Sequence, residues 1–238
     1  MQFFFQPDLS ADYVMLSPDE SKHCVKVLRK GPGDAIFLTD GKGTMVKAEL
    51  VAADMNHCSA QVVERHENYG RRNGFLHLAV APTKNPGRME WLVEKAIEIG
   101  VEKISFIVCD RSERERIDLK RLERIAVSAL KQSNTAFLPA MDVLSFDELM
   151  SQCASRECDK LLAWCDENNQ SQLVDIQFST KNILLLIGPE GDFSPREIAM
   201  ARQQQFKEVK LGDRRLRTET AALYGCCIVA AKLVGTEN

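Results

Sequence analysis

The chain has 238 residues, of which 45% are hydrophobic and 27% are charged, and its formal net charge is −3. This composition is that of a folded domain protein and excludes a disordered chain. The small negative charge also excludes a uniformly basic surface for nucleic acid, although it allows a local basic patch, because the attraction of phosphate depends on where the charges lie.

The first eight residues contain a run of three phenylalanines, which is too short for the core of a signal peptide and lacks a basic start. We expect this run to form a buried opening strand. No apolar stretch is long enough to span a bilayer. The eight cysteines include no Cys-x-x-Cys pair, so we expect reduced thiols with neither a disulfide framework nor a bound metal. Together these features predict a cytoplasmic protein.

The first seventy residues have the pattern of a small β-barrel. Strand-like runs at 35–39 and 44–50 flank an Asp-Gly-Lys-Gly turn, which predicts a hairpin, and residues 60–64 add a short strand. Several short strands in so few residues are typical of small barrels. The polar, glycine-containing segment 67–74 then predicts a domain boundary, with one domain at 1–70 and a second at 71–238.

From residue 75 onward, strands alternate with helices, which predicts a mostly parallel α/β sheet. The expected strands are 75–81, 103–108, 161–164, 183–187 and 209–211, and the nearly all-Leu/Ile run at 183–187 is expected to be central. The expected helices comprise one with apolar residues from Met89 to Ile97 that ends at Gly100, one around 119–130, one that opens at Ser145, one that opens at Ser194-Pro195, and one at 219–234.

Three segments that follow strands are candidates for a ligand site: 165–168, 188–192 and 212–220. Ligands of open α/β sheets bind outside the carboxyl ends of the strands, and glycines let the backbone approach a ligand. None of the segments is a dinucleotide-binding or P-loop motif, so ordinary turns remain an alternative. Arg214, Arg215 and Arg217 in one loop favour contact with RNA phosphate, the alternative being a solvated loop.

The residues of these loops resemble the signatures of a known family. Ile187-Gly188-Pro189-Glu190-Gly191, with Phe193-Ser194 and Glu197, resembles the IGPEGG signature of the RsmE family, and Leu211-Gly212 with 216–221 resembles its LRTETA signature. His23, Val27-Leu28-Arg29, Gly33-Asp34 and Asp40-Gly41 resemble its N-terminal pattern, and matches such as Lys84, Met89-Glu90 and Arg111-Ser112 continue in order along nearly the whole chain.

The resemblance implies two domains: a PUA-like β-barrel followed by an α/β domain of the SPOUT class, whose C-terminus forms a trefoil knot. It also implies a homodimer that uses S-adenosyl-L-methionine to methylate N3 of one uridine in the 16S rRNA of the 30S ribosomal subunit. We therefore expect an S-adenosylmethionine-dependent 16S rRNA (uracil-N3)-methyltransferase. Two rival readings are a related knotted methyltransferase that acts on tRNA or another rRNA position, and a non-catalytic RNA-binding protein with this fold. A metal hydrolase using the scattered histidines is a more distant one.

The family's functional positions map onto three groups of residues. The methyl-donor pocket is expected to include Ile187, Gly188, Pro189, Glu190, Gly191, Leu211, Gly212, Leu216, Arg217 and Thr220. Arg217 is the candidate to stabilise negative charge on the base, and Glu219 is the candidate general base or a partner that orients Arg217. A structural role is the alternative for both, which for Glu219 is a favourable interaction with the helix dipole. Contact with RNA is expected from Lys22, Lys26, Arg29, Lys30, Arg71, Arg72 and Lys84, solvated surface charge being the alternative.

The sequence departs from the family pattern at three places. Asp192 occupies the position of a second glycine, Lys131 and Thr135 replace an acidic residue and an arginine, and the stretch after Arg111-Ser112 is short. We expect the first departure to affect the rim of the donor pocket and the others to affect RNA contacts. The apolar last helix is expected to pack on a second copy through Ala221, Leu223, Cys227, Ile228 and Ala231, with the intramolecular core as the alternative.

Overall fold

The computed structural model describes residues 2–154, 156–165 and 171–234. The chain forms two compact units, one made of Met1–Arg71 with Val127–Leu138 and the other of Arg72–Ala126 with Pro139–Asn238. We call them the N-terminal unit and the α/β unit and describe each by itself. Residues 127–138, which lie inside the expected second domain, have their contacts within the N-terminal unit.

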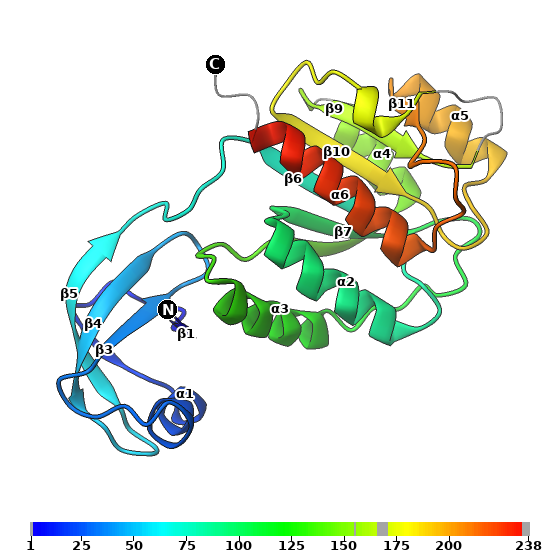
Figure 1. Cartoon of the computed structure of the whole chain (residues 1–238). Helices are drawn as coiled ribbons and strands as arrows, with labels where there is room; N and C mark the ends of the chain where they lie inside the picture. The colour runs from blue at the N-terminus through cyan, green and yellow to red at the C-terminus, as the bar shows by residue number, and fades with distance from the viewer. Residues whose placement is uncertain (1, 155, 166–170, 235–238) are drawn as a thin grey trace. The chain divides into compact units, whose positions relative to one another are not determined.

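The N-terminal unit is built on a five-stranded sheet in the order β1-β3-β4-β5-β2. The expected hairpin is present, with Thr39 paired to Met45 across the turn, and β1 pairs with β3 in parallel as an opening strand. The sheet curls but stays open, because β1 and β2 are its two edges, so it is a half-barrel rather than a closed barrel (Figure 1). Its strands are β1 Phe3–Phe5, β2 Tyr13–Met15, β3 Ala35–Thr39, β4 Met45–Ala52 and β5 Ser59–His66.

A short helical segment that the sequence patterns did not predict follows β2. Helix α1 (Pro18–Lys22) begins at Ser17, whose side chain accepts a hydrogen bond from the Glu20 amide, and it continues into a π-helical turn, η1 (His23–Val27). The turn buries Cys24 and leaves Lys26 exposed. A five-residue helix has too few residues to show an apolar period, although Ser17, Pro18 and Glu20 have the spacing of a helix start.

The tight turn of the β3–β4 hairpin explains two of its glycines. Gly43 has a φ of +108°, and a Cβ atom there would lie 2.4 Å from the Phe137 ring. A Cβ at Gly41, where φ is +73°, would lie 2.7 Å from the Leu138 side chain. The turn therefore needs glycine both for its backbone conformation and for the close approach of residues 137–138.

The α/β unit contains a six-stranded parallel sheet in the order β11-β9-β10-β6-β7-β8. As expected, the Leu/Ile-rich strand is central, since β10 lies between β9 and β6. The last strand ends at Val209, two residues before the predicted end. Edge strand β8 was not predicted, and none of its residues is buried. The strands are β6 Phe75–Val80, β7 Lys103–Val108, β8 Ala140–Ser145, β9 Asp159–Ala163, β10 Asn182–Ile187 and β11 Lys207–Val209.

The helices of this unit begin and end at the predicted signals. Gly100 ends α2 in the left-handed conformation, and Ser145 and Ser194 open α4 and α5 with complete capping boxes. Helices α2 and α6 pack on each other over one face of the sheet, and α4 and α5 cover the other (Figure 1). The elements are α2 Pro86–Ile99, α3 Leu119–Ser133, α4 Phe146–Cys153, the 3₁₀ turn η2 Leu173–Asp175, α5 Pro195–Gln203 and α6 Thr218–Val234.

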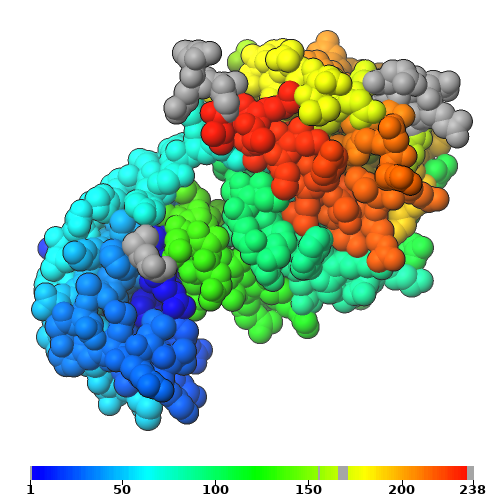
Figure 2. Space-filling model, in the orientation of Figure 1, coloured from blue at the N-terminus to red at the C-terminus, as the bar shows by residue number. Residues whose placement is uncertain are grey.

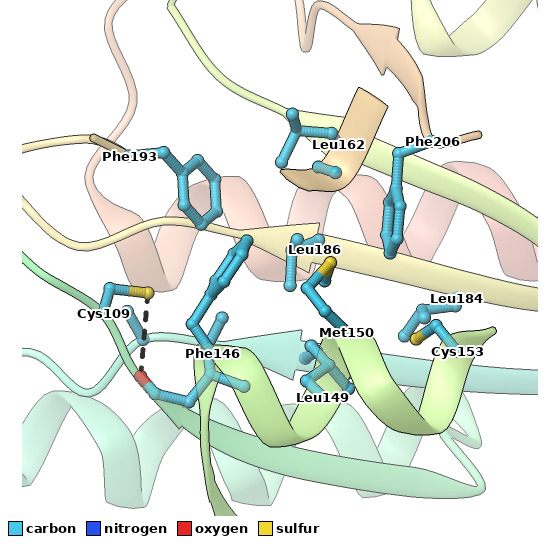
Figure 3. Close-up of a cluster of buried hydrophobic side chains, with 14 of the residues drawn as sticks. Cys109, Phe146, Leu149, Met150, Cys153, Leu162, Leu184, Leu186, Phe193 and Phe206 are labelled. Atoms are coloured by element: carbon cyan, nitrogen blue, oxygen red, sulfur yellow. Dashed lines mark hydrogen bonds between the residues drawn. The ribbon is translucent and has the colours of Figure 1, made fainter. Parts of the chain in front are cut away.

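One core of the α/β unit lies between the sheet and helices α4 and α5. The rings of Phe146 and Phe193 pack at 5.9 Å between centroids, beside Leu186 of the central strand (Figure 3). Phe193 belongs to the loop that follows β10, so this loop is fixed by its own buried side chain.

A chain of polar groups crosses the same face of the sheet near the amino ends of the strands. His77, which is 2% exposed, accepts from the Arg156 guanidinium at Nδ1 (3.4 Å) and lies 2.8 Å from Ser105 Oγ through Nε2. Ser105 donates in turn to Asp142, which is also paired with Lys103 at 2.8 Å. Burial lowers the pKa of His77 to about 3, and the positive charges of Lys103 and Arg156 act in the same direction.

This histidine predicts a dependence of stability on pH. Between its ordinary pKa of 6.5 and about 3, the unfolded chain binds a proton that the folded chain does not, so stability falls as pH falls through this window. We expect His77→Gln to make the free energy of unfolding less dependent on pH there, by up to about 1.4 kcal/mol per pH unit. Urea unfolding at several pH values measures this slope. The exposed His57→Gln is the control, and equal slopes for His77→Gln and the wild type would refute the prediction.

Candidate functional site

The carboxyl ends of β9, β10 and β11 lie at one edge of the sheet, because the three strands are parallel neighbours. The loops that leave this edge are the three segments expected to bind a ligand. Of the first segment, 165–168, only Cys165 lies within the described residues. The structure therefore gathers the two glycine-containing loops, 188–194 and 210–217, at the position where parallel sheets bind ligands.

The loop after β10 is held from two sides. A Cβ atom at Gly188 would lie 2.9 Å from the Phe193 ring, so the loop can pass over this ring only with glycine. Arg111 donates to the carbonyl oxygens of Gly191 (3.0 Å) and Phe193 (3.3 Å). The fully buried Glu197 accepts from the amides of Asp110 and Ser194, both at 2.8 Å. These contacts hold the backbone of the loop in one conformation before any ligand binds.

Asp192, where the family pattern has glycine, adopts a φ of +60°. This left-handed conformation explains the preference for glycine, and aspartate is one of the few other residues that tolerate it. The carboxylate accepts hydrogen bonds from the amides of Phe193 (2.8 Å) and Cys165 (3.0 Å). Asp192 thus ties the segment after β9 to the loop after β10, which is a structural consequence of the departure at the pocket rim.

The loop after β11 runs beside the segment that precedes η2. Lys210 pairs with this segment through the Ser171 carbonyl (2.8 Å) and the Leu173 amide (2.9 Å), and the Gly212 amide donates to Gln172 Oε1 (3.1 Å). Helix α6 then packs against η2, β6 and β10. These contacts place the C-terminal segment alongside the connection between β9 and β10.

The donor-pocket residues carried over from the family lie along this edge. Ile187 ends β10 and is buried, Leu211 and Leu216 are half-buried, and Gly212 has a φ of +91° with open space around it. Thr220 is exposed in the first turn of α6. The carbonyl of Gly188 accepts from the Thr218 hydroxyl at 3.3 Å, which joins the first turn of α6 to the loop after β10.

The two candidate catalytic residues have different environments. The carbonyl of Arg217 accepts from the Ala221 amide (2.8 Å), so Arg217 caps α6 and its side chain is exposed. Glu219 is only 6% exposed, and its Oε1 atom lies 3.5 Å from Nε of Arg88 in α2. Its Oε2 atom is buried and has no hydrogen-bond partner among the described residues. Glu219 is therefore paired with Arg88, and no such contact joins it to Arg217 in the described part of the chain.

Arg88 is the site residue that sequence reasoning missed. It lies in the first turn of α2, and its side chain is 34% exposed. The loop before α2 is fixed to the site as well, because the Lys84 amide donates to Glu190 Oε1 at 3.1 Å. The only sequence signal was its position directly before Met89-Glu90, which matches the family pattern, and a lone arginine at a helix start carries no further information.

The seven basic residues expected to contact RNA fall into two classes. Lys22, Lys26, Arg29, Arg71 and Lys84 are exposed, and Lys30 is half-buried and donates to the Ala35 carbonyl (2.9 Å). Arg72 differs, because its guanidinium is largely buried and binds Glu102 at 2.6 Å and the Gly100 carbonyl at 2.7 Å. Its charge is used within the fold of the α/β unit.

The departures at Lys131 and Thr135 lie in the N-terminal unit. Lys131 forms an ion pair at 2.7 Å with Glu20, which is 8% exposed. Thr135 accepts a hydrogen bond from the Phe137 amide at 3.4 Å. Lys131 therefore neutralises a buried carboxylate, a role that an acidic residue at this position would not fill.

Two kinds of feature are absent from the described part of the chain. No group of three or more histidine, cysteine, aspartate or glutamate side chains there is arranged to hold a metal ion. None of its helices has the length and apolarity that crossing a membrane demands.

The conformation of Asp192 predicts an order of stability. Asp192→Gly loses the two side-chain hydrogen bonds but removes the strain of the positive φ, whereas Asp192→Ala loses the bonds and keeps the strain. We expect the alanine variant to have a lower free energy of unfolding than the glycine variant by about 1 kcal/mol. Chemical denaturation measures the difference. At the exposed Asp213, which is not among the residues of positive φ, alanine should be at least as stable as glycine. An alanine variant at 192 as stable as the glycine one would contradict the explanation.

Two family models match the chain. The model described as an RNA methyltransferase domain covers residues 71–230, and the model described as an RNA methyltransferase PUA domain covers residues 16–63. The first match alone covers more than half of the chain. The PUA match falls within the N-terminal unit, and the methyltransferase match begins within one residue of the start of the α/β unit.

Relatives of known sequence or structure match along nearly the whole chain. Ribosomal RNA small subunit methyltransferase E of Bacillus subtilis is 27% identical over 90% of this chain and 88% of its own length. A structure from Porphyromonas gingivalis, described as a probable rRNA-methyltransferase, is 37% identical with a TM-score of 0.89, covering 98% of this chain and 99% of that one. Ribosomal RNA small subunit methyltransferase E from Neisseria gonorrhoeae, bound to S-adenosyl methionine, is 26% identical with a TM-score of 0.84, covering 98% of each chain.

These matches confirm the expected fold class, a PUA-like sheet followed by a parallel α/β domain of the SPOUT type. The family models, the relatives and the loop geometry agree along the whole length of the chain. The chain belongs to the RsmE family of ribosomal RNA small subunit methyltransferases.

Proposed function

We propose that this chain transfers a methyl group from S-adenosyl-L-methionine to N3 of one uridine in the 16S rRNA of the small ribosomal subunit. The observation that carries the proposal is the convergence of the loops 188–194 and 210–217 at the carboxyl edge of the sheet, beside the amino end of α6. The S-adenosyl methionine bound by the Neisseria gonorrhoeae relative supports the choice of donor. A ribosomal substrate also implies that the protein acts in the cytoplasm.

The residues present fit such a donor. Gly212 leaves the backbone of the loop after β11 bare, Gly188 lets the loop after β10 pass closely over the Phe193 ring, and the first turn of α6 has amide groups that no helical carbonyl satisfies. Bound S-adenosylmethionine supplies a methyl group on a positively charged sulfur. The preorganised loops hold the donor and exclude water, and alignment of reacting groups is worth roughly 7–11 kcal/mol of a barrier. We assign the donor pocket to the ten residues carried over from the family.

Methylation of uridine N3 requires the loss of its proton, so the site must stabilise a negatively charged base. The amino ends of α2 and α6 meet at this edge and present the positive ends of two helix dipoles. Arg217, exposed at the cap of α6, adds a positive charge next to them. Glu219 is assigned to catalysis with Arg217, and its ion pair with Arg88 favours an orienting role over that of a general base.

The proposed reaction can be tested directly. Purified protein with labelled S-adenosylmethionine and 30S subunits that lack the modification should give 3-methyluridine at a single position, because both the substrate and the donor are then present. Nucleoside analysis of the RNA identifies the product. Label in tRNA alone would replace this proposal with the related tRNA methyltransferase, and binding of RNA without any transfer would favour the non-catalytic protein.

For RNA docking we propose the exposed basic residues around η1 of the N-terminal unit. Lys22, Lys26 and Arg29 are exposed there, and Val27 beside them is 62% exposed. A π-helical turn is rare and is often found at functional positions. Arg71 and Lys84 are further exposed candidates, whereas the pairing of Arg72 with Glu102 argues against its use.

Removal of two of these charges tests the proposed docking surface. The double variant Lys26→Ala/Arg29→Ala should weaken RNA binding and reduce the slope of log affinity against log salt, because each lost phosphate contact changes the slope by about 0.7–0.9. Filter binding at several salt concentrations measures both quantities. Lys120→Ala/Arg124→Ala removes the same charge from exposed positions of α3 and serves as the control. An unchanged affinity and slope in the first variant would exclude this docking surface.

We also propose that the protein is a homodimer. The outer face of α6 exposes Tyr224 (48%) and Val234 (70%) in line with Cys227 and Ala231, and Trp91 of the neighbouring α2 is 45% exposed. Figure 2 shows the surfaces of α2 and α6 side by side. Contiguous apolar exposure of this kind is typical of an interface, and the last helix of a second copy would cover it. Of the other expected contacts, Ala221 and Ile228 are half-buried and Leu223 is buried within the fold.

The exposed apolar face of α6 leads to a prediction about the oligomeric state. Tyr224→Glu places a charge in the proposed interface and should shift the protein from dimer to monomer at micromolar concentration. Sedimentation velocity measures the change. Val174→Glu alters a residue on η2 that is similarly exposed (58%) and should leave the mass unchanged. A wild-type protein that sediments as a monomer would exclude the homodimer.

A further inference from the structure

Arg88 and Glu219 form an ion pair between the first turns of two long helices. The contact joins Arg88 Nε to Glu219 Oε1 at 3.5 Å. The carboxylate side chain is 8% exposed, whereas the arginine side chain is 34% exposed. The anion is therefore buried and the cation reaches the surface of the site.

A buried carboxylate is costly unless a cation and hydrogen bonds compensate it. Here the compensation is incomplete, since Oε2 is buried without a partner among the described residues. A buried polar atom without a partner is rare in a folded protein, and a role in catalysis is one explanation for it. The contact engages Nε, and the other N–H donors of the guanidinium are not part of it.

The position of the pair links it to the candidate site. Thr218, next to Glu219, donates to the carbonyl of Gly188, and the Lys84 amide before α2 donates to Glu190 Oε1. Both helix starts are thus attached to the glycine-containing loop 188–191. Arg88 lies where the positive ends of α2 and α6 coincide.

We propose that Arg88 is a catalytic residue of the methyl transfer and that Glu219 is its positioning residue. This proposal rests on the proposed function. In the reaction the N3–H bond of the uracil breaks and its proton passes to solvent water, while its electron pair forms the new N3–C bond. The methyl C–S bond breaks with its electrons moving to sulfur. The Arg88 guanidinium donates to a carbonyl oxygen of the uracil, where the negative charge of the deprotonated base resides.

Fixed Arg88 suits this role better than Arg217 alone. Arg217 directly precedes α6 and its side chain is exposed, and no ion pair among the described residues restrains it. A cation that is held before the substrate arrives needs no reorganisation as charge develops, which is the basis of electrostatic stabilisation in active sites. Arg217 then adds charge, and the Arg88–Glu219 pair supplies the geometry.

The experiment compares Arg88→Gln and Arg88→Lys with the wild type in single-turnover methylation of 30S subunits, after the thermal stability and donor affinity of each variant have been measured. The control is Arg121→Ala, which breaks an exposed arginine–glutamate pair between α3 and α2 (Arg121–Glu90, 2.7 Å). We expect Arg88→Gln to lower the rate constant about 100-fold or more with donor affinity unchanged, as for the loss of one charge-stabilising donor. Arg88→Lys should recover only part of it, and the control should be unaffected.

Two further readouts separate a catalytic role from a structural one. The rate of Arg88→Gln should rise with pH more steeply than that of the wild type, and RNA with 5-fluorouridine at the target, whose N3 proton is more acidic, should restore a large part of the loss. Glu219→Gln should show the same pH behaviour with a smaller loss. Rates equal to the wild type in Arg88→Gln, or a loss that neither pH nor 5-fluorouridine changes, would overturn the assignment. A wild type that methylates no uridine would instead overturn the proposed function.

Discussion

The parallel pairing of β9, β10 and β6 is the constraint on which the rest of the α/β unit depends. Because β10 pairs with both neighbours in parallel, the chain leaves all three strands at the same edge, and every loop with a candidate function begins there. A purely parallel sheet must be covered on both faces, which explains why α2 and α6 lie on one face and α4 and α5 on the other. The helix starts then meet at that edge as well.

At this edge a few side chains hold the backbone of the loops in place through hydrogen bonds. Glu197 satisfies two amides from its buried position, Arg111 binds two carbonyl oxygens, and Asp192 adds a link to Cys165. Such an arrangement leaves the backbone as the surface offered to a ligand. A pocket made of backbone tolerates sequence change as long as the supporting contacts survive, as the aspartate in a glycine position illustrates.

Features with a local cause were predictable from the sequence. The Asp-Gly hairpin, the caps at Ser145 and Ser194, the end of α2 at Gly100 and the central strand at 183–187 each depend on residues close together in the chain. The loops proposed to bind the donor were assigned through resemblance rather than physics, because a Gly-Pro-Glu-Gly segment alone is typical of turns.

Features that depend on distant partners were not predictable in this way. Strand β8 is assigned to the sheet by its pairing with β7, and its short run with Met141, Val143 and Leu144 does not by itself predict an edge strand. The turn η1 is too short to show a period. The partners of Arg72, Lys131 and Glu219 are set by tertiary packing, with Glu219 lying 131 residues from Arg88 in numbering (219 minus 88). An isolated charged residue in a sequence does not reveal whether it faces water, a buried partner or a substrate.

The position of β10 has a consequence for biosynthesis. Strands β6 and β9 are not neighbours in the sheet, and the strand that joins them ends only at residue 187. During translation β6 and β9 therefore each have an unpaired edge until β10 has been made. The centre of the sheet can pair only after roughly four-fifths of the 238 residues have been synthesised. Nascent chains of this protein should depend on protection from aggregation until late in synthesis. The loop after β11 can be completed only when the chain is nearly ready to leave the ribosome.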